Sequence, residues 1–209
     1  MTTTALGILA GGAARRLGGA DKALLPLGDG RPVLGHALDR LRPWPGPVVL
    51  VASGDPARFA PFDLPVVGDS VAEPEGGRAG PLAGILAVLE WVRDHAPDVE
   101  AAVTVPCDGP CLPRDLLARL RAAREVEGAT IAMATSGGRV HPVVALWPVA
   151  LAADLRRAVS QEGLRAVHAW TARYPVAVVD WPVAPVDPFL NINTPEELTR
   201  ARAWTAAPS

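Results

Sequence analysis

Residues 9–22, LAGGAARRLGGADK, follow a short apolar run and combine four glycines with two arginines and a lysine. Glycine lets the backbone turn sharply after a buried strand and direct successive N–H groups toward an anion. Arg15, Arg16 and Lys22 bring positive charge to the same segment. The glycine spacing fits neither the Walker A loop nor the GxGxxG loop. The segment therefore predicts a phosphate site of another kind; the alternative is a structural turn with solvated cations.

The bulk properties of the chain favour one domain without a broad charged surface. Its 209 residues fit a single domain over residues 1–209, and a two-domain division is not required. The formal net charge of −2 excludes an overall basic field for nucleic acid or an anionic membrane, so anion binding must be local. No apolar run approaches the length of a membrane span, about 18 residues. The N-terminus has no basic segment followed by the hydrophobic core of a signal peptide. We therefore expect a cytoplasmic protein. Cys107 and Cys111 are too few for a disulfide framework or a zinc site, so we expect reduced thiols.

Apolar runs of strand length alternate along the chain with segments of helical spacing. The runs cover residues 5–10, 47–52, 65–67, 101–105, 129–134, 141–147 and 176–181. Apolar residues with helical spacing lie between them, at residues 33–41, 82–92 and 116–120. Mostly continuous apolar runs are typical of strands that are buried on both faces. The alternation predicts an α/β sandwich with a mainly parallel sheet, whose ligands gather at the carboxyl ends of the strands.

Two helix starts can be predicted from local signals. Pro113 suits the first turn of the helix that follows it. The tetrapeptide at residues 194–197, Thr-Pro-Glu-Glu, is a capping box with proline at the first helical position. The last helix is therefore expected to begin at Thr194.

Asp108 directly follows an apolar strand in the sequence VTVPCD, residues 103–108, so we expect it near the mouth of the glycine loop. A carboxylate facing a phosphate repels it unless a divalent cation lies between them, and Mg²⁺ is commonly bound by one or two carboxylates plus substrate phosphates. We therefore predict Asp108 as a Mg²⁺ ligand; the alternative is a turn cap. Asp69 follows another predicted strand in the same way, and metal, base, ribose and turn-cap roles all stay open for it.

Further polar residues lie in the last third of the chain. Asn191 and Asn193 are two apart, so an extended segment places them on one side, where they can act together on phosphate or on water around Mg²⁺. Capping of the following helix is the alternative for Asn193. Arg139 and His141 form another polar cluster at a strand start, although a lone histidine is usually structural.

The motifs that are missing also narrow the chemistry. The chain has no GxSxG elbow, no HExxH motif and no convincing Cys/His nucleophile pair. Cys107 has no base nearby in sequence, which argues against it as a nucleophile. A reaction between two phosphates needs no protein nucleophile, because the attacking phosphate oxygen is already ionised. Catalysis would then consist of holding two anions in line while Lys22, Arg16, backbone amides and Mg²⁺ on Asp108 neutralise charge.

The ordered motifs LAGGAARRLGGADKALLP, GPLAGI, VPCD, HP and FLNINTPEEL resemble the molybdenum cofactor guanylyltransferase family over nearly the whole chain. The resemblance implies a Rossmann-like three-layer sandwich of the nucleotide-diphospho-sugar transferase type. It implies transfer of GMP from GTP to the terminal phosphate of molybdopterin, with release of pyrophosphate, Mg²⁺ dependence and transient contacts with molybdoenzyme-maturation proteins. By the same resemblance, Lys22 meets the phosphates, Asp108 carries the metal, and Asn191 and Asn193 lie toward the second substrate. We assign Arg139 and His141 to this predicted acceptor side as well. The implied nucleotide-binding residues are Leu9, Ala10, Gly11, Gly12, Lys22, Asp69, Gly84 and Asp108.

Several departures and alternatives accompany this resemblance. Leu17 replaces a common methionine, Ala13 replaces a frequently polar residue, and residues 72–78 form an enlarged acidic stretch that puts the acceptor in doubt. Cytidylyl transfer to the same cofactor is the nearest alternative, and Gly11 favours guanine because the cytidylyl enzymes resemble LAAG here. Nucleotidyl transfer to another phosphorylated acceptor and a non-catalytic nucleotide-binding module are the remaining alternatives.

Overall fold

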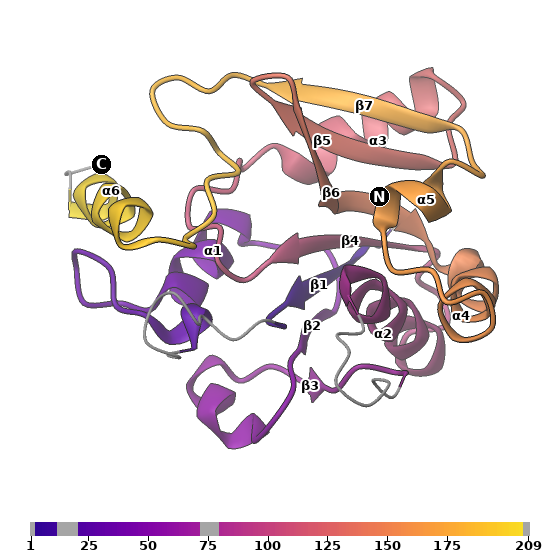
Figure 1. Ribbon diagram of the computed structural model, residues 1–209, viewed down its shortest axis with the longest axis horizontal. Helices are drawn as coiled ribbons and strands as arrows, with labels where there is room; N and C mark the ends of the chain where they lie inside the picture. Colours follow the sequence, from indigo (N-terminus) through magenta and orange to yellow (C-terminus); the bar gives the residue numbers. More distant parts are fainter. Residues whose placement is uncertain (1–2, 12–20, 72–79, 207–209) are drawn as a thin grey trace.

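The computed structural model describes residues 3–11, 21–71 and 80–206, and its centre is a seven-stranded sheet (Figure 1). The strand order is β3-β2-β1-β4-β6-β5-β7. The strands are β1 (Ala5–Leu9), β2 (Val48–Val51), β3 (Val66–Val67), β4 (Ala101–Pro106), β5 (Ile131–Ser136), β6 (Arg139–Pro148) and β7 (Val176–Trp181). Each of the seven predicted apolar runs overlaps one of these strands.

The sheet is mainly parallel, as predicted, with β6 as the exception. β1, β2, β3 and β4 pair in parallel, and β5 pairs in parallel with β7. β6 lies between β4 and β5 and is antiparallel to both. Six strands therefore end at one edge of the sheet, and β6 begins at that edge. We call it the carboxyl edge.

Helices cover both faces of the sheet and complete the three layers. One apolar core packs α1 (Val33–Leu41) and α3 (Leu116–Val126) against one face. A second core packs α2 (Gly80–His95), α4 (Ala152–Ser160) and α5 (Val167–Thr171) against the other. The 3-10 turns are η2 (Lys22–Leu24), η3 (Pro56–Phe62) and η4 (Val149–Leu151). α6 (Pro195–Ala206) stands beside the sheet near α1 in Figure 1, and its Ala201 belongs to a small cluster with Leu27, Val33 and Ile192.

Three details differ from the sequence predictions. α3 begins at Leu116, so Pro113 lies in the preceding turn rather than in the helix, and its carbonyl accepts the Leu116 N–H at 3.2 Å. β7, an edge strand, alternates buried and exposed residues because only one of its faces is covered, by the core that also contains α1 and α3. α4 and α5 were not predicted; α5 spans only five residues, too few to show helical periodicity.

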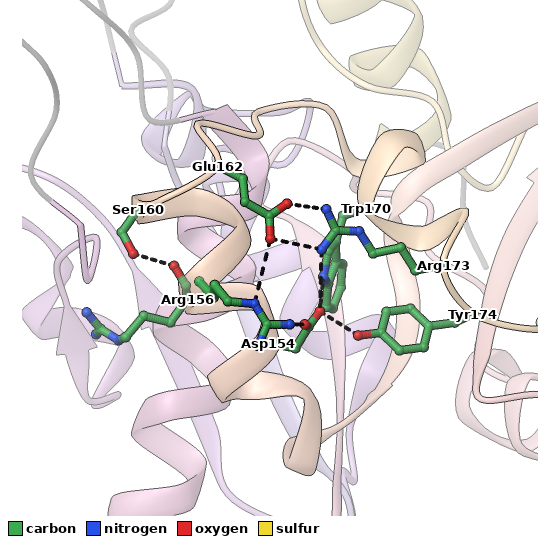
Figure 2. A network of polar contacts seen from close by, with 8 residues as sticks. Asp154, Arg156, Ser160, Glu162, Trp170, Arg173 and Tyr174 are labelled. Carbon is green, nitrogen blue, oxygen red and sulfur yellow. Dashed lines mark hydrogen bonds and ion pairs between the residues drawn. The ribbon is translucent and has the colours of Figure 1, made fainter.

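The two unpredicted helices are joined by a polar network around Asp154 (Figure 2). Asp154 Oδ2 accepts hydrogen bonds from Trp170 Nε1 at 2.8 Å and from the Tyr174 hydroxyl at 2.5 Å. Arg157 also pairs with Asp154, and Arg173 pairs with Glu162. These bonds lower the pKa of Asp154, first through the Tyr174 hydroxyl, because they favour the carboxylate. Short helices are thereby held together by tertiary contacts.

Within the described ranges, no helix combines the length and the apolar character that crossing a membrane requires. Cys107 and Cys111 are both buried and unpaired as thiols, in line with the prediction of reduced cysteines.

Candidate active site

The backbone after β1 forms the base of the candidate site at the carboxyl edge. The Ala10 N–H donates to the carbonyl of Val51 at 2.7 Å, and the Cys107 N–H donates to the carbonyl of Leu9 at 3.0 Å. The end of β1 is thus fixed to the neighbouring strand on each side, with Gly11 exposed beyond it. The predicted residues Gly12 and Arg16 lie outside the described residues.

Lys22 opens the turn η2, and Asp21 caps that turn. Asp21 Oδ1 accepts the Ala23 N–H at 3.1 Å, and its Oδ2 accepts Arg58 Nε at 2.8 Å. Arg58 also donates to the carbonyl of Ser53 at 2.6 Å and to that of Asp55. The guanidinium therefore links the segment after β2 to the residue before Lys22.

Lys22, Asp108 and Asn193 meet although they are far apart in sequence. Lys22 Nζ lies 3.2 Å from Asp108 Oδ2 and donates to Asn193 Oδ1. The Ile192 N–H donates to the carbonyl of Asp108 at 3.1 Å, which holds the segment before α6 against the end of β4. The side chains of Lys22 and Asp108 are only 18% and 13% exposed, so both charges are partly removed from water. Burial raises the pKa of Asp108, and the ammonium of Lys22 opposes this shift.

The side chain of Asn193 does not cap α6, because Thr194 and Glu197 cap it. Thr194 Oγ1 accepts the Glu197 N–H at 3.2 Å, and Glu197 Oε2 accepts the Thr194 N–H at 2.9 Å. This reciprocal pair is the predicted capping box. The Asn193 N–H also donates to Glu197 Oε2, which leaves the amide side chain directed at Lys22.

Gly84 of α2 brings two other predicted nucleotide-binding residues together. A Cβ added at Gly84 would lie 3.3 Å from the side chain of Leu9 and 3.9 Å from Asp69 Oδ1. Helix α2, the end of β1 and the segment after β3 therefore converge at this point of the carboxyl edge.

A bulge in β6 builds a cavity beside this cluster. Gly137 and Gly138, both with positive φ, form the two-residue turn between β5 and β6, so Ser136 pairs with Arg139. Ala134 pairs with His141 but Met133 pairs with Ala145, so residues 142–144 bulge out of the ladder. The cavity has a volume of about 200 Å³. Its lining comprises Pro106, Leu112, Arg139, Val140, His141, Pro142, Val143, Val144, Phe189 and Asn191.

Three of the four predicted acceptor-side residues line this cavity, namely Arg139, His141 and Asn191. Asn193 does not, and it contacts Lys22 instead. The two asparagines therefore serve neighbouring places rather than one common side. His141 is buried, with its ring 4.7 Å from that of Phe189, and its Nε2 lies 2.8 Å from Ser136 Oγ.

Among the described residues, the site has one candidate metal ligand, and its neighbouring thiol is not suited to act as a nucleophile. No three His, Cys, Asp or Glu side chains in those residues gather as a ligand set. Asp108 alone fits the common Mg²⁺ arrangement of one carboxylate plus waters and substrate phosphates. Burial raises the pKa of the Cys107 thiol far above neutrality, so this thiol stays protonated.

Four polar residues near the site were not predicted from sequence. Asp21 and Arg58 position the Lys22 turn, whereas Ser136 and Asp187 lie behind His141. Asp21 precedes the lysine directly and is a typical cap residue, which is a signal that could have identified it. The other three come into place only through pairing of distant segments.

The chain is similar to known proteins over most of its length. Residues 6–176 match the MobA-like NTP transferase domain. A molybdenum cofactor guanylyltransferase of Rhodopseudomonas palustris (strain HaA2) is 53% identical over 194 residues, which cover 93% of this chain and 88% of that protein. The chain belongs to the molybdenum cofactor guanylyltransferase family.

Solved structures of low sequence identity share the fold of this chain. Molybdopterin-guanine dinucleotide biosynthesis protein A of Archaeoglobus fulgidus superposes with a TM-score of 0.71 at 24% identity, over 97% of this chain and 99% of that one. A Mycobacterium tuberculosis H37Rv protein solved in complex with manganese superposes with a TM-score of 0.66 at 20% identity, over 97% of this chain and 100% of that one. These likenesses show a shared nucleotidyltransferase fold.

Proposed function

We propose that this chain transfers GMP from GTP to the terminal phosphate of molybdopterin and releases pyrophosphate. The observation that carries the proposal is the position of Lys22, whose Nζ lies between Asp108 and Asn193 at the carboxyl edge. An ammonium beside a partly buried carboxylate is suited to an anionic ligand that brings a cation with it. The names of the relatives supply the identity of the nucleotide and the acceptor.

The two substrates are assigned to adjoining parts of the carboxyl edge. On the nucleotide side we place Leu9, Ala10, Gly11 and Gly12 along the nucleotide, with Asp69 and Gly84 near the nucleoside. On the acceptor side we place Arg139, His141 and Asn191, which line one cavity. Asn193 lies between the two sides because it contacts Lys22.

A divalent cation, Mg²⁺ in our proposal, would be held by Asp108. When bound, the cation would neutralise charge on the α-phosphate and on pyrophosphate. The single carboxylate fits a metal that takes its other ligands from phosphates and water. The structural neighbour solved with manganese is consistent with a divalent metal.

The reaction needs positioned charge rather than a protein nucleophile. A terminal phosphate oxygen of the acceptor attacks the α-phosphorus of GTP and forms the new P–O bond. The bond from the α-phosphorus to the bridging oxygen breaks, and pyrophosphate leaves with that electron pair. Lys22, together with Arg16 and the backbone amides after β1, would stabilise the negative charge of the transition state.

The proposal is tested by measuring acceptor-dependent pyrophosphate release with GTP and, separately, with CTP, in the presence of Mg²⁺ and molybdopterin. We expect release with GTP, and we expect Asp108→Asn to lower kcat by about 100-fold or more because the neutral amide is a poor metal ligand. Asp98→Asn is the matched control. Asp98 is exposed and precedes the start of β4, at the opposite edge of the sheet, so we expect its activity to stay within about twofold.

Each other outcome contradicts a defined part of the proposal. Release with CTP and not with GTP would make the chain a cytidylyltransferase. Equal activity of Asp108→Asn and the wild type would remove Asp108 as the metal ligand. No release with either nucleotide would contradict transfer to molybdopterin.

A further inference from the structure

Three polar side chains from three segments meet at the wall of the cavity. Ser136 ends β5, His141 belongs to β6, and Asp187 lies between β7 and α6. Ser136 Oγ lies 2.8 Å from His141 Nε2 and 2.8 Å from Asp187 Oδ1. Ser136 and His141 are both buried, at 2% and 8% exposed. The proposed phosphate chemistry does not need these hydrogen bonds, so we ask which protonation state of His141 they hold.

Counting protons assigns the direction of each hydrogen bond. A carboxylate only accepts hydrogen bonds, so the single proton of the Ser136 hydroxyl is donated to Asp187. Asp187 Oδ1 also accepts the Phe189 N–H at 2.9 Å, which fixes its orientation. Ser136 Oγ can then only accept from His141, so the proton of His141 is on Nε2.

The ring of His141 is neutral at neutral pH. Burial lowers its pKa and Arg139 lowers it further, whereas Asp187 raises it, with a net shift downward from 6.5. A neutral ring with its proton on Nε2 carries a free lone pair on Nδ1. Nδ1 has no hydrogen-bond partner among the described residues. Every buried side-chain nitrogen or oxygen of those residues has a partner, so Nδ1 is not a buried atom. Because His141 lines the cavity, we place Nδ1 in contact with the cavity.

We propose that Ser136 and Asp187 hold His141 in the Nε2–H tautomer, so that Nδ1 accepts a hydrogen bond from an N–H group of the acceptor substrate. This inference rests on the proposed function, because it concerns the acceptor side of the same site. It makes His141 a specificity-determining residue and makes Ser136 and Asp187 positioning residues that act through it.

The cavity indicates the class of group that would bind. Its volume of about 200 Å³ is smaller than the roughly 300–1,000 Å³ of sites for drug-sized ligands, so it suits one ring system rather than a whole dinucleotide. Phe189 and Leu112 give apolar walls, Asn191 gives an amide, and Arg139 gives a cation near the rim. A planar nitrogen heterocycle with N–H donors and an attached anionic group matches these features.

The first test measures the tautomer directly, without any substrate. In NMR spectra of nitrogen-labelled protein at neutral pH, a protonated ring nitrogen is distinguished from an unprotonated one, and His141→Leu assigns the signals of His141. We expect the proton on Nε2 and a bare Nδ1 in the wild type, and a mixture of tautomers in Ser136→Ala. A wild-type proton on Nδ1 would overturn the proposal.

The second test separates the two substrates kinetically. We expect His141→Leu to raise KM for the acceptor about fivefold to tenfold while KM for GTP stays unchanged, since a single hydrogen bond is lost on the acceptor side only. Ser136→Ala is expected to raise KM for the acceptor by a smaller factor, which is set by the fraction of His141 that keeps the Nε2–H tautomer. Ser136→Thr keeps a hydroxyl and is expected to restore the wild-type KM. Thr135→Val is the matched control, because its hydroxyl bonds instead to Val179 and Asp180 of β7.

The outcomes distinguish this inference from the proposed function. Unchanged acceptor KM in both Ser136→Ala and His141→Leu would overturn the role of Nδ1 while leaving guanylyl transfer intact. Absence of turnover in the wild type would overturn the proposed function, and the NMR measurement would still decide the tautomer. A raised KM for GTP in Ser136→Ala would indicate general damage to the site and would contradict the acceptor-specific role.

Discussion

At the scale of single residues, Lys22 is positioned by groups from separate segments of the chain. Asp21 caps its turn, Arg58 holds Asp21, and Asp108 and Asn193 contact its ammonium. A flexible four-carbon side chain has many rotamers, so such contacts reduce the entropy that is lost when the ammonium meets a ligand. We therefore expect the residues around Lys22 to affect the rate even where they touch no substrate.

Arg58 provides a test of this positioning. Arg58→Ala removes the hydrogen bond to Asp21 and the two bonds to the backbone after β2. We expect kcat to fall about tenfold, because misplacement of a catalytic group lowers the rate without removing it. Arg58→Lys has one ammonium for three acceptors, so its kcat is expected to lie between those of Arg58→Ala and the wild type. The measurement is the steady-state rate of pyrophosphate release.

Arg93→Ala is the control for Arg58. Arg93 is half-exposed and pairs with its sequence neighbour Asp94, so its loss should leave kcat unchanged. Equal rates for Arg58→Ala and the wild type would contradict the positioning of Lys22 through Asp21.

At the scale of secondary-structure elements, one buried hydroxyl group supplies a hydrogen bond to a backbone carbonyl in the bulge of β6. The carbonyl of Val143 leaves the sheet ladder at the bulge, and Thr104 Oγ1 of β4 donates to it at 2.6 Å. Thr104 Oγ1 also accepts Trp147 Nε1 at 2.7 Å, and both Thr104 and Trp147 are fully buried. The wall of the cavity therefore depends on a threonine that does not line it.

We expect Thr104→Val to lower the free energy of unfolding by about 2–3 kcal/mol. The isosteric valine leaves a buried carbonyl and a buried indole N–H without partners, and unsatisfied buried groups are costly. Thr104→Ser keeps the hydroxyl and loses one methyl group, so a loss of about 1 kcal/mol is expected. Urea denaturation measures both values. A smaller loss in Thr104→Val than in Thr104→Ser would contradict the role of the hydroxyl.

The Asp154 network predicts how the attachment of α5 to α4 responds to pH. The hydrogen bonds of Tyr174 and Trp170 hold the pKa of Asp154 below its ordinary value of 3.8. A carboxyl whose pKa is lower in the folded state stabilises the protein at pH values above its unfolded pKa. That contribution is lost as the pH falls through the lower, folded value.

We therefore expect the wild type to have a larger free energy of unfolding than Asp154→Asn at pH 7. We expect this difference to become smaller as the pH falls below about 4. Denaturation with urea at a series of pH values measures it. The asparagine keeps an oxygen acceptor for Trp170 Nε1, which limits the change to the loss of charge. A difference that grows toward acid pH would contradict the lowered pKa.

At the scale of the whole molecule, local sequence patterns predict most of the strands and helices. They do not predict which distant segments come into contact. Continuous apolar runs predict the strands, because most strands of a mainly parallel sheet with helices on both faces are buried. Asp108 is predictable because it directly follows a buried strand. Helix α5 is not predictable, since five residues carry no periodicity and Trp170 is held by packing on Trp147, with ring centroids 5.9 Å apart.

In the candidate site, too, single residues can be predicted from the sequence but their contacts cannot. Lys22 and Asp108 are indicated by residue type and place, whereas Ser136 and Asp187 are 51 residues apart and meet at the carboxyl edge of the sheet. Asn191 and Asn193 are recognisable as a pair, but the contact of Asn193 with Lys22 depends on how the segment before α6 crosses the end of β4. Local patterns thus identify residues, and topology decides which of them meet.

We propose that GMP itself is transferred from GTP to molybdopterin at the cluster of Lys22, Asp108 and Asn193. GTP labelled at the α-phosphate provides the most direct test. We expect the label to appear in the molybdopterin product with wild-type protein and Mg²⁺, and not with Asp108→Asn. Label that remains in free GMP or GTP, while molybdopterin stays unlabelled, would contradict the account.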